Sequence, residues 1–168
     1  FTAHRDRPDV SPMVVFMPGV RSGGGAERYA VALAAVLAGD PTQHVVLATT
    51  GDVDERFIET HFGIDPSEMS IRILHDPPTW TQRLPQALFD LLEDVTWARQ
   101  VSRLRPVLFV NGLYRSEIPG LGRHNIYVSH FPHRLVRRWS PWPRQLYMRA
   151  VGGLRRVLLG RRDFRSTY

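Results

Sequence analysis

The sequence predicts an α/β domain of the Rossmann-like, three-layer α/β/α type, built on a mainly parallel sheet. Short apolar runs alternate along the chain with longer amphipathic stretches, and glycine or proline marks most of the boundaries. The apolar runs are nearly continuous rather than alternating, which is typical of parallel strands buried on both faces. The 168 residues, 43% of them hydrophobic, suit one domain of this kind.

The strands are expected where apolar and β-branched residues run together and turn residues follow. The first such run is MVVFM, which ends at Pro18-Gly19. The five predicted strands cover residues 13–17, 44–49, 69–74, 107–110 and 125–129. Residues 1–12 are mostly polar and are predicted to be a loose lead-in, so the domain itself is expected to span residues 13–168.

Four helices are predicted between and after these strands. The first runs from the glycine-rich segment to about Leu37, with Gly39 as its C-terminal cap, and the others cover residues 54–62, 81–104 and 143–160. The first helix contains AVALAAVLA, which is apolar nearly all round, so it is expected to be largely buried. The third carries a stripe at helical spacing, formed by Leu84, Leu88, Leu91, Val95 and Ala98.

The charges are unevenly distributed. All 22 basic residues are arginine, and 11 of them lie in residues 123–168 beside a single acid, Asp163, whereas residues 1–122 hold 15 acids. This asymmetry indicates an anionic partner for the C-terminal third. Arginine alternates with Trp139 and Trp142 there, which suits an anionic membrane surface, and arginines on a solvated face or against a further domain give the same pattern. No nucleic-acid motif accompanies them, so nucleic acid is not a predicted partner.

Several classes of function are excluded by what the sequence lacks. It has no cysteine, so disulfides, thiol catalysis and cysteine-based metal sites are excluded. No apolar run approaches 18 residues and no signal-peptide pattern is present, so neither a membrane span nor a secreted protein is expected. These features favour a cytoplasmic location, at the inner face of the membrane if the basic segment binds lipid.

A glycine-rich segment lies between the first predicted strand and the first predicted helix. Gly23, Gly24 and Gly25 let backbone N–H groups approach a ligand, and the helix N-terminus adds partial positive charge, so a phosphate or carboxylate is expected there. Glu27, three residues after Gly24, is placed to cap the first turn. The spacing matches neither GxGxxG nor GxxxxGK[ST], and a tight turn without a ligand is the alternative.

Polar residues follow two further strands, at the edge where parallel sheets bind ligands. Asn111 closes the fourth predicted strand, where it either contacts a ligand or simply forms an Asn-Gly turn. Tyr114 and Arg115 follow it and are further candidates for contact with a substrate. His130 follows the fifth predicted strand within NIYVSHFPH. His133 makes an HxxH pair with His130, but no further ligand lies near, so no metal site is predicted.

Two of these segments resemble the family-four retaining glycosyltransferases, which include phosphatidylinositol mannosyltransferases and many lipopolysaccharide transferases. The similar segments are GGGAERYAVALA and the strand-end histidine of NIYVSHFPH, and the likeness extends over roughly residues 13–168. It implies that the domain is the N-terminal half of a GT-B fold. It also implies that the glycine loop approaches donor phosphates or acceptor, that His130 contacts the donor sugar or positions the acceptor, and that His133 and Arg134 lie on the acceptor side.

The resemblance further implies what this chain does not contain. The family's nucleotide-sugar site, with its Glu-x7-Glu segment, belongs to a C-terminal donor domain that is absent here. The parent protein is then expected to transfer a sugar from a nucleotide-diphosphate sugar, with retention, to a lipid-linked or polysaccharide acceptor. It needs no other cofactor, and the fragment alone is expected to be inactive. A non-catalytic α/β module that binds phosphate or nucleotide is the main alternative, and a stand-alone membrane-surface module is a weaker one.

Overall fold

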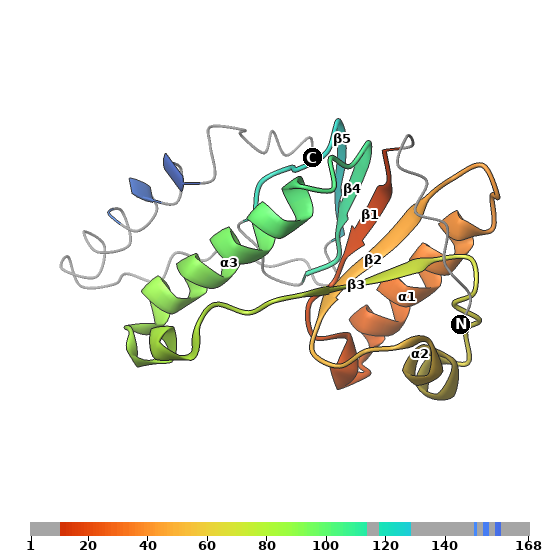
Figure 1. The fold of residues 1–168 in the computed structure, drawn as a ribbon, viewed down its shortest axis with the longest axis horizontal. Helices are drawn as coiled ribbons and strands as arrows, with labels where there is room; N and C mark the ends of the chain where they lie inside the picture. The colour runs from red at the N-terminus through yellow and green to blue at the C-terminus, as the bar shows by residue number, and fades with distance from the viewer. Residues whose placement is uncertain (1–10, 114–117, 129–149, 151–152, 155–156, 159–168) are drawn as a thin grey trace.

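The structure, a computed structural model, describes residues 11–113 and 118–128, together with residues 150, 153–154 and 157–158. It contains a five-stranded, all-parallel sheet with helices on both faces (Figure 1). The predicted Rossmann-like α/β/α architecture is therefore confirmed. The strands are β1 (Met13–Phe16), β2 (Val45–Thr50), β3 (Ser70–Leu74), β4 (Leu108–Asn111) and β5 (His124–Tyr127). The α-helices are α1 (Gly25–Ala38), α2 (Glu55–Phe62) and α3 (Gln86–Ser102), and two short 3-10 helices are η1 (Val20–Ser22) and η2 (Thr79–Arg83).

The strands lie in the order β3-β2-β1-β4-β5, so β1 is at the centre of the sheet. In register, Phe16 at the end of β1 lies between Ala48 of β2 and Asn111 of β4. Each predicted strand is present, with ends that differ from the prediction by no more than two residues. The largest difference is at β5, which ends at Tyr127, two residues before its predicted end.

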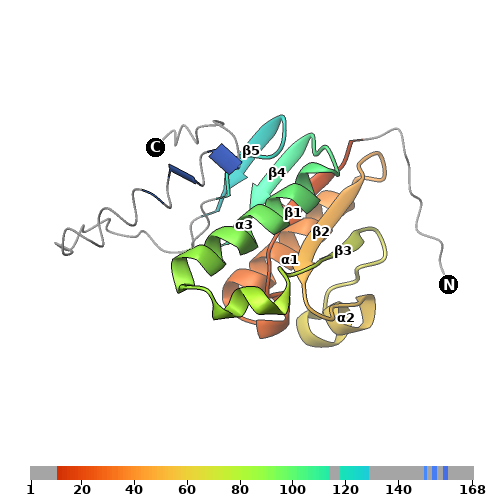
Figure 2. The same cartoon turned by 60° about the vertical axis from the view of Figure 1, so that its left-hand side comes forward.

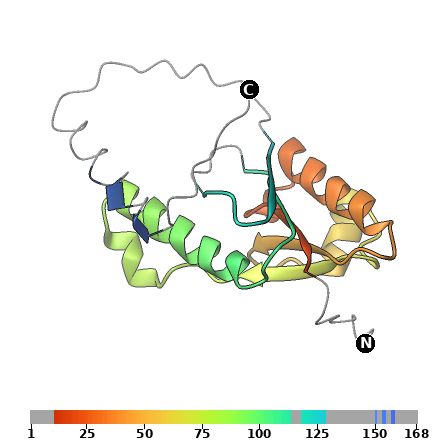
Figure 3. The same cartoon turned by 90° about the horizontal axis from the view of Figure 1, so that it is seen from above.

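The two faces of the sheet bury separate apolar clusters. On one face, Val15 and Leu47 pack with the buried side of α1 and with Ile58 of α2. On the other, Val14, Phe16 and Phe109 pack with Trp97, Ala98 and Val101 of α3. Figures 2 and 3 show this arrangement, with α1 and α2 on one side of the sheet and α3 on the other. The uninterrupted apolar character of the strands follows from this double coverage.

The third helix starts later than predicted. A single helix was expected over residues 81–104, but the chain forms η2, passes through an extended Leu84 (ψ 155°) and begins α3 after Pro85. The reason is that a proline ring clashes with a helical conformation of the residue before it. Of the predicted stripe, Leu91, Val95 and Ala98 are buried within α3, whereas Leu84 lies outside the helix.

The prediction that the first helix is largely buried is wrong for its outer side. Ala30, Val31, Ala34 and Ala38 face the sheet and are buried. Tyr29 and Val36 point away from the sheet and are 48% and 76% exposed. Helix α1 is the outer layer on its side of the sheet, so apolar sequence on all sides does not ensure burial on all sides.

The edge strand β5 is shaped by close backbone contacts. Its four residues are all exposed, in contrast to the buried interior strands. A Cβ at Gly122 would lie 2.9 Å from the backbone nitrogen of Phe109, so β5 can approach β4 only if a glycine precedes it. The side chain of Asn125 accepts from the Gly122 N–H and donates to its carbonyl, which fixes the turn into β5.

Two predicted segments fall largely or wholly outside the described residues. Residues 1–10 of the predicted lead-in are among them. Of the predicted helix over residues 143–160, the structure describes residues 150, 153–154 and 157–158, which are helical. No helix among the described residues is long and apolar enough to cross a membrane.

Helix α3 is fastened to the end of β3 beside a group of acids. Gln100 donates to the carbonyl and accepts from the N–H of His75, at 2.8 and 2.9 Å, and Trp97 Nε1 donates to Asp76 at 3.2 Å. Half-buried Glu93 lies in the same region. Its partial burial, and the negative charges of Asp76, Asp90 and Asp94, raise the pKa of Glu93 to about 7.

This environment makes stability depend on pH. Because the folded-state pKa of Glu93 is raised, the stabilisation that its protonated carboxyl gives the folded state is fully present below about pH 4.5 and is lost as the pH rises through about 7. We expect Glu93→Gln to raise the melting temperature at pH 8 while changing it little at pH 4.5. Thermal unfolding at both pH values tests this, with exposed Glu68→Gln as the control. An equal effect of Glu93→Gln at the two pH values would contradict it.

Candidate functional site

The candidate site lies at the carboxyl edge of the sheet, where β1 and β4 are adjacent. From β1 the chain builds the sheet outward through β2 and β3, and it then returns to add β4 on the other side of β1. The connection after β1 leads to α1 on one face, whereas the connection after β4 places Ile118 in the apolar cluster on the other face. Such a switch in strand order leaves a crevice outside the strand ends, which is where open α/β sheets bind ligands.

The loop after β1 is built around glycines with left-handed backbone angles. Gly19 (φ 77°) and Gly23 (φ 69°) bracket η1, and Gly24 is the N-terminal cap of α1. The Gly19 N–H donates to Thr50 Oγ1 at 3.2 Å, which fastens the start of the loop to the end of β2. The loop is thus held by two neighbouring strands.

The first turn of α1 keeps its backbone donors available. Gly24 has no side chain to cap it, so the N–H groups of Gly25, Ala26 and Glu27 have neither an N-cap acceptor nor an intrahelical one. Gly25 also faces open space where a Cβ would stand. These N–H groups and the helix dipole make this a favourable place for electron-rich ligand atoms.

Glu27 folds back over the glycine loop. Its carboxylate accepts from Ser22 Oγ at 2.8 Å, and a Cβ on Gly24 would lie 2.5 Å from Glu27 Oε2. The half-buried carboxylate therefore already supplies a negative charge at the N-terminus of α1. An additional anion there would be repelled by Glu27, whereas a hydroxyl group can donate a hydrogen bond to it.

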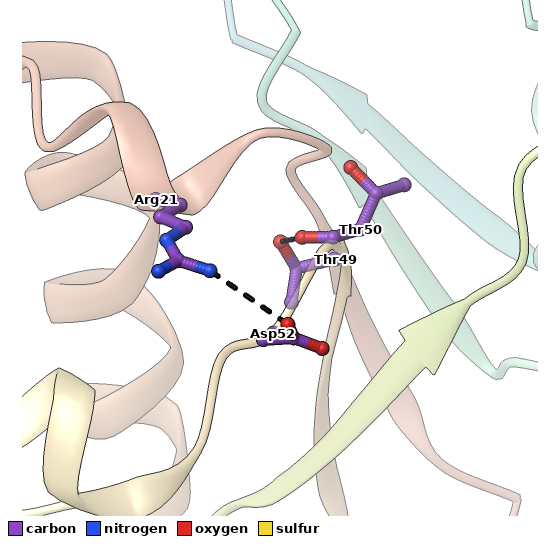
Figure 4. Close-up of polar contacts among 4 residues, drawn as sticks. All are labelled: Arg21, Thr49, Thr50 and Asp52. Atoms are coloured by element: carbon purple, nitrogen blue, oxygen red, sulfur yellow. Dashed lines mark hydrogen bonds and ion pairs between the residues drawn. The ribbon is translucent and has the colours of Figure 1, made fainter.

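Polar residues at the end of β2 extend this edge, and they were not among the predicted site residues. Thr49 is buried, and Thr50 carries the bond to Gly19. Figure 4 shows Arg21 reaching from η1 towards Asp52, at 3.8 Å, beside the two threonines. Both charged side chains are largely exposed, so this pair contributes little to stability. In the sequence, the two threonines that end an otherwise apolar strand could have indicated these polar residues.

Arg28 belongs to the glycine motif but is directed elsewhere. Its guanidinium lies 5.9 Å from the centre of the Phe62 ring, and it donates to the His61 carbonyl at 3.5 Å. The contact places a cation at the C-terminal end of α2, where the helix dipole favours it. Arg28 therefore joins α1 to α2 rather than facing the loop.

Asn111 is buried at the end of β4. Its Oδ1 accepts from the Leu113 N–H at 3.0 Å, which forms the turn that the Asn-Gly pair predicts. Its Nδ2 is buried and has no hydrogen-bond partner within the described part of the chain. The next residue, Gly112, lies against α1, since a Cβ there would be 3.3 Å from Met17 Cε and 3.6 Å from Ala30 Cβ. The end of β4 thus lies close to the helix that carries the glycine loop.

The structure brings part of the predicted set together. Gly23, Gly24, Gly25 and Glu27 form one loop and helix start, and Asn111 ends the strand next to the one that this loop follows. Tyr114, Arg115, His130, His133 and Arg134 lie outside the described residues, so their proposed roles stay predictions. Within the described residues, no group of three or more His, Asp or Glu side chains is placed to hold a metal ion.

Comparison with known proteins identifies no relative, since no family model, no curated protein and no solved structure matches the chain.

Gly23 has a left-handed backbone conformation and Gly24 does not, so replacing each with alanine gives a matched test of the loop. Gly23→Ala forces a side chain into a left-handed conformation and should destabilise the fold by about 1 to 2 kcal/mol. Gly24 has ordinary angles, and a Cβ there meets only the movable end of Glu27, so Gly24→Ala should cost less than Gly23→Ala, about 0.5 kcal/mol, because alanine is a poorer N-cap than glycine. Urea denaturation of both variants measures the difference, and equal losses would contradict this account of the loop.

Proposed function

We propose that this chain is the N-terminal, acceptor-side domain of a retaining glycosyltransferase with a GT-B fold. In the full-length protein, a second domain that binds a nucleotide-diphosphate sugar faces the carboxyl edge of the sheet and completes the site. The observation that carries the proposal is the position of the glycine loop, with Glu27 folded over it, at the strand-order switch between β1 and β4. The GGGAER and SHFPH segments, which resemble this family, add to it.

The chemistry of the loop favours a hydroxyl-bearing ligand over a phosphate. The first N–H groups of α1, which have no N-cap side chain, can donate hydrogen bonds to a ligand, and the Glu27 carboxylate can accept them from it. Sugar and polyol hydroxyls both donate and accept, so they match this mixed set. A phosphate would satisfy the N–H groups but would lie beside a like charge. The charge of Glu27 therefore favours an acceptor sugar at the loop over a phosphate, which the main alternative, a phosphate-binding module, would bind there.

In this proposal the residues of the chain bind and orient, and the donor domain holds the nucleotide. Retaining transfer proceeds through an oxocarbenium-like state as the nucleotide phosphate departs, so groups that hold the acceptor hydroxyl close to the sugar promote it. Glu27 and the first turn of α1 are assigned to the acceptor. His130 is assigned to the reacting sugar or the acceptor hydroxyl. The arginine- and tryptophan-rich segment 134–144 is assigned to an anionic membrane surface, where a lipid-linked acceptor would be met.

Removing the charge of Glu27 should have opposite effects on ligand binding under the two hypotheses for the loop, an acceptor sugar or a phosphate. We expect Glu27→Gln to raise the KM for the acceptor several-fold, because a hydrogen bond to a carboxylate is about 1 kcal/mol stronger than one to an amide. If the loop instead binds phosphate, Glu27→Gln should tighten the binding of inorganic phosphate or UDP, which titration calorimetry measures. Exposed Glu59→Gln on α2 is the control for the lost charge.

The role of His130 is tested in the full-length protein with UDP-, GDP- and ADP-linked sugars and a lipid extract as the acceptor. We expect His130→Ala to reduce release of the nucleoside diphosphate at least about tenfold, the effect of losing one hydrogen bond to a charged group in the transition state. His124→Ala is the matched control, because His124 is the first residue of β5 and so lies at the amino ends of the strands, away from the carboxyl edge that holds the glycine loop.

Two outcomes would count against the proposal. Undiminished transfer by His130→Ala would remove the role assigned to that residue. Binding of phosphate or nucleotide without turnover of any sugar nucleotide would favour the non-catalytic module.

A further inference from the structure

The side-chain amide of Asn111 is only half satisfied by the fold. Its Oδ1 accepts from the Leu113 N–H at 3.0 Å, which fixes the orientation of the amide and therefore the position of Nδ2. Asn111 is fully buried, and none of the groups that the structure describes accepts a hydrogen bond from Nδ2. Because buried polar groups nearly always have a partner, this free donor indicates a group that the chain itself does not supply.

The strand pairing around Asn111 does not need the amide nitrogen. The Asn111 carbonyl accepts from the Val128 N–H at 2.9 Å, and the Gly112 N–H donates to the Phe16 carbonyl at 2.9 Å. These bonds continue the pairing of β4 with β5 and with β1, and Oδ1 forms the turn. The ladder and the turn are thus made without Nδ2.

The other asparagine of the chain, Asn125, shows the contrast. Its Oδ1 accepts from the Gly122 N–H at 2.9 Å, and its Nδ2 donates to the Gly122 carbonyl at 3.0 Å. Asn125 lies on the exposed strand β5, where water could satisfy it, and yet both ends of its amide are bonded within the chain. Asn111 is buried, and one end of its amide is not bonded.

Asn111 lies across the sheet from the glycine loop. Along β4, Phe109 packs in the apolar cluster on the α3 side and Val110 in the cluster on the α1 side, so the alternation of the strand puts the Asn111 side chain on the α3 side. Glu27 and the first turn of α1 lie on the other side. The strand-order switch between β1 and β4 therefore has a free donor on one side and a carboxylate on the other.

We propose that Nδ2 of Asn111 is a ligand-binding donor of the candidate site and that it recognises a neutral oxygen atom, the hydroxyl oxygen of a sugar. The inference rests on the proposed function and deepens it, because Asn111 becomes a second contact for the acceptor sugar, opposite Glu27. Different hydroxyls of one sugar can accept from Nδ2 and donate to the Glu27 carboxylate.

The surroundings of Asn111 favour a neutral oxygen over an anionic one. Phe16, Phe109 and Ile118 are buried in the apolar cluster on this side of the sheet. Phe16 is also the partner of Asn111 in the register of β1 and β4. A phosphate or carboxylate oxygen would meet one neutral amide in apolar surroundings, which leaves its charge uncompensated, whereas a hydroxyl oxygen is satisfied by that single donor.

Selective isotope labelling of asparagine nitrogen tests this on the unmodified chain, because its two asparagines give one side-chain signal pair each. The probes are the methyl α-glycosides of glucose, mannose and galactose at up to about 100 mM, which populates a site of millimolar affinity. We expect at least one glycoside to shift the Asn111 pair by more than its linewidth and to slow its exchange with solvent. The Asn125 pair, already bonded to Gly122, should stay in place.

Two variants complete the test. Asn125→Asp keeps the acceptor for the Gly122 N–H and removes one signal pair, which assigns the other. Asn111→Ser keeps a hydroxyl that can form the turn but lacks the amide donor, so it should raise the dissociation constant of the glycoside at least about threefold, the effect of one neutral hydrogen bond. Asn125→Asp should leave that constant unchanged, and circular dichroism checks that both variants fold.

The backbone amides of Gly24 and Gly25, followed by glycine labelling, separate failure of this inference from failure of the proposed function. A glycoside that shifts these amides but not the Asn111 pair overturns the inference and leaves the loop as a sugar site. Glycosides that shift neither overturn the inference and remove the hydroxyl-bearing ligand from the loop as well. A shift of the Asn111 pair by inorganic phosphate or UDP, but by no glycoside, overturns the neutral class of ligand. A long-lived water that keeps its Overhauser contact to Nδ2 at the highest glycoside concentration also overturns the inference, because the donor then serves a structural water.

Discussion

The burial of β1 on every side is the constraint on which the rest of the structure depends. Val14, Val15 and Phe16 are fully buried, with β2 and β4 paired on either edge and helices on both faces. A central parallel strand of this kind requires crossovers on opposite faces, so the connections diverge at its carboxyl end. The glycine loop and the turn at Asn111 lie at this edge because of that divergence. The position of the candidate site is therefore a consequence of the core.

Helix α1 both packs against the sheet and supplies part of the candidate site. Its inner side is small and apolar, which lets it lie close to the sheet and to Gly112. Its first turn leaves N–H groups available, and Glu27 places a carboxylate beside them. These features occupy different parts of the same short helix, so a change at Glu27 can alter ligand binding without disturbing the packing of α1 on the sheet.

The sequence predicted the architecture well because the interior strands are continuous apolar runs, which is the pattern of parallel strands buried on both faces. Each interior strand is a distinct apolar run, so its position can be read directly from the sequence. Helix ends depend on single residues, and Pro85 sets the start of α3 later than predicted. The exposure of Val36 could not be predicted, since an all-apolar helix gives no sign of which side remains uncovered. The bond from Gly19 to Thr50 joins residues 31 positions apart, and such pairings follow from the strand order rather than from any local pattern.

Asn111 illustrates why a residue type at a strand end reflects both fold and site. The buried turn after β4 needs an uncharged acceptor for the Leu113 N–H, and the asparagine amide provides one. Aspartate would supply the same oxygen but would place an ionised carboxylate in a buried position, which is far more costly. The amide brings with it an Nδ2 group that the turn does not use. No described group accepts from this Nδ2, so a polar ligand atom at this edge would satisfy it.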